Sequence, residues 1–292
     1  MHAINRRGFT LIELIIALAL GALVGAAVLQ AIVGTQRSSQ AGLQRIDLQQ
    51  NLRAGMGYIT SVVRELNAAD GDIGAATPTL LRFRGMRWAS PLCSPPVVAG
   101  GASAFLLINS NAVYGLGTPD AASDSLLVYA EGDPGTRADD TWLVGEVASL
   151  GTATCTGGAS ALRLSARITA ATGGIPALAG VTSGAPLRGF QWEELSVFQG
   201  AEGRWWIGRR TASRSGGWTA VEPLVGPITA AGLALQYYDS TGAVTATLAN
   251  IASIAVTLRA ESMSMVRTRP GDIDFARDSL LSHVALRNNP RF

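Results

Sequence analysis

The sequence predicts an α+β protein in which one long N-terminal helix is followed by a β-rich globular body. Two observations predict this division. No charged side chain lies between Glu13 and Arg37, and an amphipathic helical pattern continues from there to about residue 67. From about residue 70 the chain is instead rich in Gly, Ala, Ser, Thr and Pro, with short apolar runs between turn signals. Such runs are typical of strands joined by tight turns.

The first part of the helix is long and apolar enough to span a membrane. Residues 14–29 carry no polar side chain. Residues 9–33, taken as one helix, extend about 37 Å at ~1.5 Å per residue, which exceeds a hydrocarbon core of ~30 Å. Arg6 and Arg7 precede this segment. Because basic residues stay on the cytoplasmic side, we expect a cytoplasmic N-terminus in residues 1–8 and an external body.

Two simpler interpretations leave features of this segment unexplained. An ordinary cleaved signal peptide has an apolar core of ~7–15 residues and needs neither an acidic residue nor an amphipathic continuation. In a plain signal anchor, Glu13 would only complement the positive end of the helix dipole, an effect of up to about 1 kcal/mol. An acid toward the middle of a span costs roughly 2.5–3.5 kcal/mol, so we expect Glu13 to have a partner and a function.

The helix is predicted to continue beyond the membrane as an amphipathic segment over residues 34–68. Its apolar positions recur at steps of three or four residues and are Leu43, Ile46, Leu52, Met56, Ile59, Val63 and Leu66. This stripe is expected to dock on the globular body, although Gly55 and Gly57 weaken the helical pattern. Within the span, Gly21 and Gly25 form a small-xxx-small pair, a spacing that lets helices approach closely.

The body, residues 69–292, is expected to be β-rich with few helical stretches. At roughly 220 residues it can bury a core as one domain or as two closely packed lobes. No stretch is long or polar enough to be an interdomain linker. The apolar runs predict strands at residues 80–88, 104–108, 125–130, 142–147, 161–168, 195–199, 205–210, 233–238 and 254–258.

Residues 6–14, Arg-Arg-Gly-Phe-Thr-Leu-Ile-Glu-Leu, closely resemble the class III signal of type IV prepilins and type II secretion pseudopilins. In that family a prepilin peptidase cuts after the glycine and methylates the new terminal amine, which implies cleavage after Gly8 and N-methylation of Phe9. The glutamate at the fifth mature position corresponds to Glu13. The resemblance implies a span that stays in the inner membrane until it joins a filament, where a neighbouring subunit's Phe9 ammonium would neutralise Glu13.

The body resembles the W-type minor pilins and the related J-type minor pseudopilins, chiefly at residues 124–129, 222–228, 237–239, 242 and 251–258. The resemblance implies a pilin-like fold with the long helix packed on a mainly antiparallel sheet. It also implies a non-enzymatic subunit that primes or joins a type IV pilus and contacts other pilin or pseudopilin subunits through the N-terminal helix. The length of 292 residues favours the W type over the J type of a type II secretion system.

Two cysteines, Cys93 and Cys155, fall in the external body. An even number of cysteines outside the cytoplasm favours a disulfide, and closing so long a loop would stabilise the body by about 4 kcal/mol in the chain-entropy model. A pair of buried thiols is the alternative. The sequence has no CxxC motif, and nothing places these cysteines at a metal-binding spacing.

The composition excludes several enzyme classes. All 23 basic residues are arginines, which excludes a Walker A loop, a Schiff-base lysine and a Ser-x-x-Lys nucleophile. The histidines are His2 and His283, and no Gly-x-Ser-x-Gly motif is present. Three acidic pairs have a spacing that sometimes binds calcium, although solvated turns are the stronger interpretation: Asp70/Asp72, Asp139/Asp140 and Asp272/Asp274. We therefore expect no enzyme activity, metal or cofactor.

Arginine and tryptophan alternate in residues 204–210, followed by Arg214 and Trp218. Single-strand nucleic-acid binders combine cations and aromatics in this way, so a competence or adhesion subunit that binds DNA or a receptor is a second functional alternative. Another basic strand holds Arg82, Arg84, Arg87 and Trp88. We favour a β-hairpin with turns at Gly203 and Gly216, tryptophans in the core and arginines in water. A net charge of +2 gives no domain-wide basic surface, so no nucleic-acid partner is expected.

Overall fold

The computed structural model describes residues 10–101, 103–133, 135–136, 140–170, 175–213, 216–269 and 272–287. Within them the chain forms one long helix, a large sheet and two short 3-10 helices. The helices are α1 (Leu11–Arg64), η1 (Ile175–Gly180) and η2 (Leu248–Asn250). The strands are β1 (Ile73–Thr77), β2 (Leu80–Pro91), β3 (Val97–Gly100), β4 (Ser103–Asn109), β5 (Tyr114–Gly115), β6 (Ser125–Ala130), β7 (Thr141–Thr154), β8 (Ser160–Ala170), β9 (Pro186–Gln199), β10 (Trp205–Thr211), β11 (Glu222–Tyr238), β12 (Ser253–Arg269) and β13 (Asp272–Ala285).

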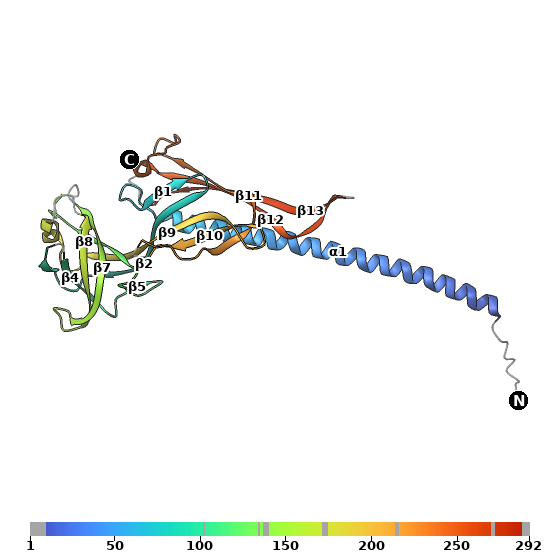
Figure 1. Ribbon diagram of the computed structural model, residues 1–292, viewed down its shortest axis with the longest axis horizontal. Coiled ribbons are helices and arrows are strands. Elements are labelled where there is room, and N and C mark those ends of the chain that lie inside the picture. The colour runs from blue at the N-terminus through green and yellow to red at the C-terminus, as the bar shows by residue number, and fades with distance from the viewer. Residues whose placement is uncertain are drawn as a thin grey trace, which may run out of the picture. The chain divides into compact units, whose positions relative to one another are not determined.

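The predicted α+β class is confirmed, with a long apolar helix and a mainly antiparallel sheet. Along the sheet the strands follow the order β13-β12-β11-β10-β9-β6-β7-β8-β4-β3, and β2 pairs with β1, β5 and β9 off this path. Strand β9 holds two groups of strands together, because residues 187–190 pair with β6 and residues 193–199 pair with β10. Its other edge pairs with β2 over residues 186–196. Figure 1 shows β4, β7 and β8 grouped at one end of β2 and β9.

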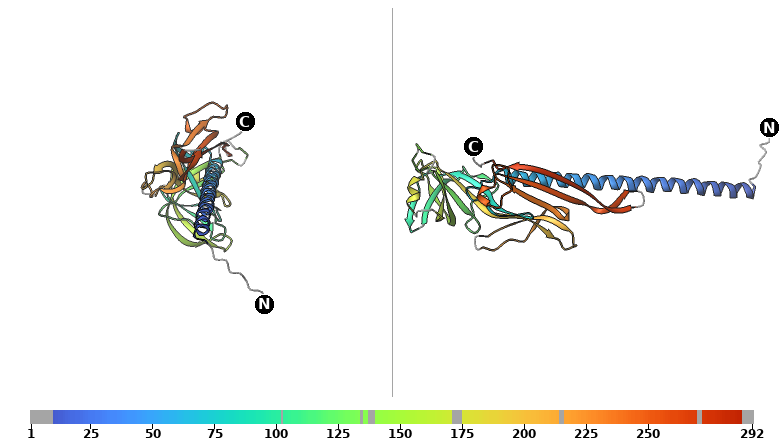
Figure 2. Two further views of the ribbon diagram at one scale, coloured as in Figure 1. Left: turned by 90° about the vertical axis from the view of Figure 1, so that its right-hand side faces the viewer. Right: turned by 90° about the horizontal axis from the view of Figure 1, so that it is seen from above.

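The chain divides into two compact units. One contains residues 1–51 and 261–278, and the other contains residues 52–260 and 279–292. Helix α1 runs through both without a break (Figures 1 and 2). Each unit is described by itself below.

The first unit joins the outer part of the helix to the β12–β13 hairpin. The Ser264 N–H donates to the side-chain oxygen of Gln44 at 3.3 Å. Within the hairpin, the hydroxyl of Ser262 donates to the carbonyl of Ser264 and accepts from the N–H of Ala276. Leu48 is buried in this unit, with 5% of its surface exposed. The hairpin therefore contacts the helix through a polar group at Gln44.

In the second unit, the last turns of α1 bury their apolar stripe. Leu52, Met56, Ile59 and Val63 are all buried, as their spacing predicts. A Cβ at Gly55 would lie 2.4 Å from a methyl carbon of Val225 in β11, so the glycine that weakens the helical pattern in the sequence is what permits close contact with the sheet.

The helix ends at Arg64, four residues before the boundary expected at residue 68. Residues 65–68 lead into a turn in which the Asn67 N–H donates to the Asp72 carboxylate at 2.8 Å and the Asp72 N–H donates to the Asn67 carbonyl at 3.1 Å. The N–H of Arg287 donates to the Arg64 carbonyl at 2.8 Å. This bond satisfies a carbonyl that the helix end leaves without an intrahelical partner.

Every predicted strand is present, but several are longer than predicted and β1, β3, β5 and β13 were not predicted. The core under β4, β6, β7 and β8 is a continuous apolar cluster that includes Trp88, Leu106, Val128, Leu143 and Leu164. Cys93 and Cys155 form a disulfide at its edge, with their Cα atoms 5.4 Å apart. The bridge joins the segment after β2 to the segment after β7.

Candidate functional site

The beginning of α1 is held by reciprocal hydrogen bonds between Thr10 and Glu13. Glu13 Oε2 accepts from the backbone N–H and from the hydroxyl of Thr10, each at 3.0 Å. The Glu13 N–H donates to the Thr10 hydroxyl at 3.3 Å. This is a capping box, in which the side chains of the first turn satisfy backbone donors. The predicted processing residues Gly8 and Phe9 lie outside the described residues.

Glu13 is exposed and no charged partner is recorded for it within the described part of the chain. Among the described residues, its carboxylate accepts hydrogen bonds from the neutral groups of Thr10. At the edge of an apolar segment such a charge is costly unless a cation meets it. The geometry therefore leaves room for a cation from another molecule on the solvent-facing side of Glu13.

The first half of α1 presents a continuous apolar surface. In the described residues α1 is the single helix long and apolar enough to cross a membrane, and none of its most apolar window is buried. The exposed large side chains are Leu11, Ile12, Leu14, Ile15, Ile16, Leu18, Leu20, Leu23, Val24, Val28, Leu29, Ile32 and Val33. Since exposed apolar surface of this extent is unfavourable in water, lipid or other helices must cover it.

Gly21 and Gly25 lie on this surface as predicted from their positions in the span. No heavy atom outside the local helix lies within 4 Å of the place where a Cβ would stand at either residue. The two glycines therefore form a shallow, open strip on one side of the helix. Such a strip allows the backbone of a second helix to approach closely.

The body contains two buried carboxylates that sequence reasoning missed. Glu194 accepts from Arg82 at 2.8 Å and from Arg210 Nε at 2.7 Å, one arginine on each carboxylate oxygen. Asp124 accepts from the Arg87 guanidinium and from the Trp88 indole N–H at 2.7 Å. Both side chains are at most 1% exposed. Because these carboxylates are hydrogen-bonded inside the protein, the cost of burying their charges is offset by paired donors.

Burial also raises the pKa of two carboxylates that accept fewer hydrogen bonds, Asp72 and Glu193. The pKa of Asp72 is raised chiefly by burial, against the opposing effect of the Asn67 N–H and the Arg84 guanidinium. The pKa of Glu193 is raised by burial as well, although Arg209 lies 3.6 Å from its carboxylate. These groups lie where helix α1 meets β2, β9 and β10, so they make that contact sensitive to pH.

The predicted hairpin of tryptophans and arginines is partly wrong. Gly203 and Gly216 do form turns, with φ of +75° and +85°. Strand β10 lies between β9 and β11, and its residue in the core is Ile207, while Trp205 and Trp206 are half-buried. Arg209 and Arg210, on the same strand, do not extend into water as predicted. They are half-buried in ion pairs with Glu193 and Glu194 of β9. The arginines therefore share the protein surface with the tryptophans.

The acidic pairs do not form a metal centre in the part of the chain that the structure describes, where no group of three or more His, Cys, Asp or Glu side chains comes together. Asp70 and Asp72 bind the side chain or backbone of Asn67. Asp274 pairs with Arg277 at 3.3 Å. Asp139 is outside the described residues. The imidazole of His283 lies 5.1 Å from the Tyr238 ring.

Comparison with known proteins gives a family match in the N-terminal part of the chain. Residues 4–29 match the family model of the prokaryotic N-terminal methylation motif. No curated protein and no solved structure matches the chain. The matched residues include Gly8, Phe9, Glu13, Gly21 and Gly25. The match supports a class III signal peptide of the kind that pilins and pseudopilins carry, which implies a prepilin peptidase and other pilin-like subunits as partners.

Proposed function

We propose that this chain, whose first residues form a class III signal, is a minor pilin-like structural subunit that primes or joins a type IV pilus filament. The observation that carries the proposal is the methylation motif at residues 4–29, which continues into the unburied apolar surface of α1. Cleavage after Gly8 would remove the arginines of the leader and leave the membrane span in the mature chain. The product would therefore stay in the inner membrane, with its body in the periplasm, until it enters a filament.

The open strip and the acidic residue on α1 give the filament contact its chemistry. The mature terminus at Phe9 would carry a methylated amine that remains cationic. Glu13, which has only Thr10 as a recorded partner among the described residues, would accept this cation from a neighbouring subunit. Gly21 and Gly25 would let the two helices come close enough to bury the pair. A subunit out of register would leave an unpaired charge in an apolar core, so this contact would also select the register.

The body supports a structural role and not catalysis. Its buried carboxylates are bound by arginines and by an indole N–H, and its cysteines are joined to each other. We propose that it is the surface through which the subunit meets other subunits and the cell exterior. A J-type pseudopilin of a type II secretion system would have the same helix chemistry and would differ in the subunits that it contacts.

Crosslinking in intact cells tests the proposal. A photoreactive amino acid in place of Leu23, whose side chain is 68% exposed, should form adducts with the N-terminal helices of other pilin-like subunits. The same substitution at Leu164, which is fully buried in the body, is the control and should give none. Mass spectrometry of the adducts identifies the partners and separates a pilus from a secretion machine. Adducts with lipid alone at Leu23, in cells that assemble the filament, would overturn the proposal.

A further inference from the structure

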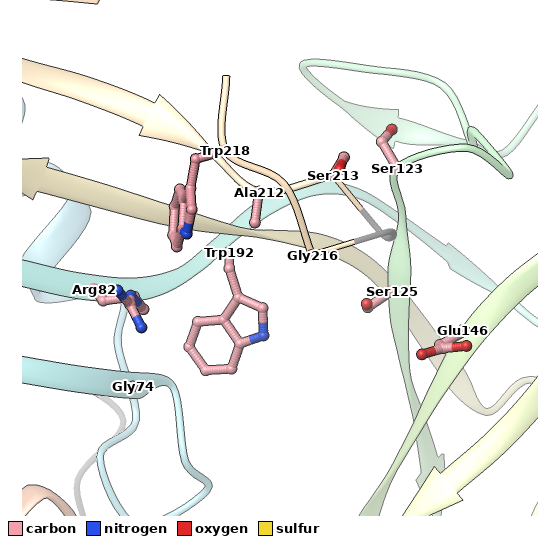
Figure 3. A pocket seen from close by; sticks show the side chains of 10 residues that line it. All are labelled: Gly74, Arg82, Ser123, Ser125, Glu146, Trp192, Ala212, Ser213, Gly216 and Trp218. Atoms are coloured by element: carbon pink, nitrogen blue, oxygen red, sulfur yellow. The ribbon is translucent and has the colours of Figure 1, made fainter. Parts of the chain in front are cut away.

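A pocket on the body combines an aromatic platform with a serine hydroxyl and a glutamate carboxylate on its opposite wall. The cavity has a volume of about 400 Å³ and lies where β2, β6, β7 and β9 meet the segment between β10 and β11. Figure 3 shows the indole of Trp192 across its centre, with Arg82 and Trp218 to one side and Ser125 and Glu146 to the other. All of these residues belong to the same compact unit. The pocket plays no part in the helix contacts described above.

The platform is rigid because its surroundings fix the ring of Trp192. A Cβ at Gly74 would lie 2.8 Å from ring atom Cζ3, so a glycine is what lets β1 pass beside the indole. The Arg84 guanidinium lies 5.4 Å from the ring centroid, and Phe190 packs edge-to-face at 6.1 Å. A ring held in this way loses little entropy when a ligand stacks on it.

Trp218 forms one wall of the pocket and is also fixed. The guanidinium carbons of Arg82 and Arg210 lie 4.9 Å and 4.8 Å from the centroid of its ring. Both arginines bind the buried Glu194, Arg82 through Nε at 3.2 Å and Nη2 at 2.8 Å. Their charge is therefore largely neutralised by Glu194, and here the two arginines hold the indole in place.

The opposite wall carries polar groups with free hydrogen-bonding capacity. Ser125 in β6 and Glu146 in β7 are direct cross-strand neighbours, and both line the pocket. Within the described part of the chain no hydrogen bond or ion pair is recorded for the Ser125 hydroxyl or the Glu146 carboxylate. The carboxylate can accept from two ligand hydroxyls, and the neighbouring serine hydroxyl can donate to a third ligand oxygen. These groups face the platform across the cavity (Figure 3).

We propose that this pocket binds a neutral saccharide, one sugar ring of which stacks on Trp192 while its hydroxyls bind Ser125 and Glu146. A pyranose has an apolar C–H face and a rim of hydroxyls, which matches an indole flanked by a hydroxyl and a carboxylate. A nucleic acid also stacks on tryptophan, but its phosphates need unpaired cations. Among the described residues, the charged side chains that line this pocket are Arg82, already bound to Glu194, and Glu146, which repels phosphate.

Binding is measured on the full chain in amine-oxide micelles or lipid nanodiscs, since alkyl-glycoside detergents would themselves compete for the site. The probes are maltotriose, cellotriose, lactose and triacetylchitotriose, each titrated to about 10 mM and followed by saturation-transfer NMR and tryptophan fluorescence. At least one probe should bind saturably. Its affinity should change less than about twofold between 50 and 500 mM salt, because no counterions are released.

Three variants distinguish this pocket from the rest of the surface. Trp192→Ala should weaken binding at least about tenfold, and Glu146→Gln about three- to tenfold. Trp142→Ala is the matched control, since Trp142 is a half-buried tryptophan of β7 that packs under Arg188 and edge-to-face with Tyr129 outside the pocket lining. It should leave the affinity unchanged. Glu146→Gln alters no contact recorded in the fold, so it keeps the test valid where Trp192→Ala lowers stability.

The proposal is overturned if none of the four probes binds, or if Trp192→Ala and Glu146→Gln bind like the unchanged chain. It is also overturned if a thymidine oligonucleotide binds at this site with an affinity that falls about tenfold or more over the same salt range. None of these outcomes bears on filament assembly. The saccharide site and the proposed assembly role can therefore fail independently.

Discussion

Thr10 and Glu13 cap each other at the beginning of α1. The Thr10 hydroxyl is 3.0 Å from Glu13 Oε2, and it accepts from the Glu13 N–H at 3.3 Å. Glu13 therefore has a local role at the helix terminus as well as any role between subunits. The two roles use different properties of the side chain. Capping needs a hydrogen-bond acceptor, whereas pairing with a neighbouring amine needs a negative charge.

The mature chain is expected to begin with N-methylated Phe9. Cleavage after Gly8 follows from the methylation motif at residues 4–29 and from the position of Arg6 and Arg7 ahead of it. Intact-mass and peptide spectrometry of membrane-extracted protein should find the methylated terminus. Gly8→Leu should accumulate as the unprocessed chain in the membrane. A terminus after the apolar run, near Ala27, would instead mean that an ordinary signal peptidase removes the whole segment.

The local pattern of apolar residues was sufficient to predict the helix and the strands that have a buried apolar face. Strand β13 was missed because it is the last strand of the sheet and its exposed positions interrupt the apolar pattern. The first half of β9 was missed for a different reason. A Cβ at Gly189 would lie 2.0 Å from the indole of Trp88, so a glycine that weakens the strand pattern is required by core packing.

The clusters around Glu194 and Asp124 could not be predicted from the sequence, because their members are far apart along the chain. Arg82 and Glu194 are separated by 112 residues, and Arg87 and Asp124 by 37. Alternation of arginine and tryptophan favoured a hairpin but did not say which carboxylates the arginines would meet. Only the register of β2, β9 and β10 brings Arg82 and Arg210 onto one carboxylate and leaves Trp192 facing a cavity.

Cys155→Ser should destabilise the body without blocking membrane insertion. The bridge to Cys93 closes a loop with a sequence separation of 62, for which the chain-entropy model gives about 4 kcal/mol. Thermal unfolding in micelles should show the loss, and the membrane level should stay unchanged. Cys93→Ser should have an equal effect, and the double variant should add nothing further, because either change already removes the bridge. Two titratable thiols in the unchanged, periplasm-exposed protein would contradict this prediction.

Acidification should stabilise the body through Glu193. Burial raises the pKa of Glu193 above its usual value, so the folded chain binds this proton more tightly than the unfolded chain does. Stability from this group is therefore gained as pH falls through the folded pKa toward the unfolded value of about 4.3, and is lost as pH rises.

The comparison with Glu193→Gln isolates this effect, since glutamine does not titrate. The unfolding midpoint of the unchanged chain, measured relative to that of Glu193→Gln, should rise as the pH is lowered from neutral toward the unfolded pKa of about 4.3. Asp72→Asn tests the same rule at a second carboxylate whose pKa is raised by burial, and the shift should have the same sign. A difference between the variant and the unchanged chain that is constant with pH would mean that Glu193 is as solvated in the fold as in the unfolded chain.

Glu13→Ala and Glu13→Gln should both prevent efficient filament assembly, although only the first removes the cap. Glutamine can take the place of glutamate in a capping box, so Glu13→Gln keeps a hydrogen-bond acceptor for Thr10 and loses only the charge. In either variant a neighbouring Phe9 amine would be left unpaired in an apolar core. Recovery in sheared filaments should therefore fall at least about tenfold. Insertion should be unchanged or slightly easier, because an acid near hydrocarbon is costly.

Thr10→Val is the matched control, since it removes the hydroxyl of the cap and leaves the carboxylate charged. It should assemble close to the unchanged level, and cleavage after Gly8 should survive in all three variants. Recovery is measured in sheared filaments and in crosslinked subunit complexes, with membrane level as the reference. If Glu13→Gln assembles normally while Glu13→Ala and Thr10→Val are equally impaired, the carboxylate acts as a helix cap alone. Pairing between Glu13 and a neighbour's Phe9 would then have no part in assembly, because loss of the charge would have had no effect.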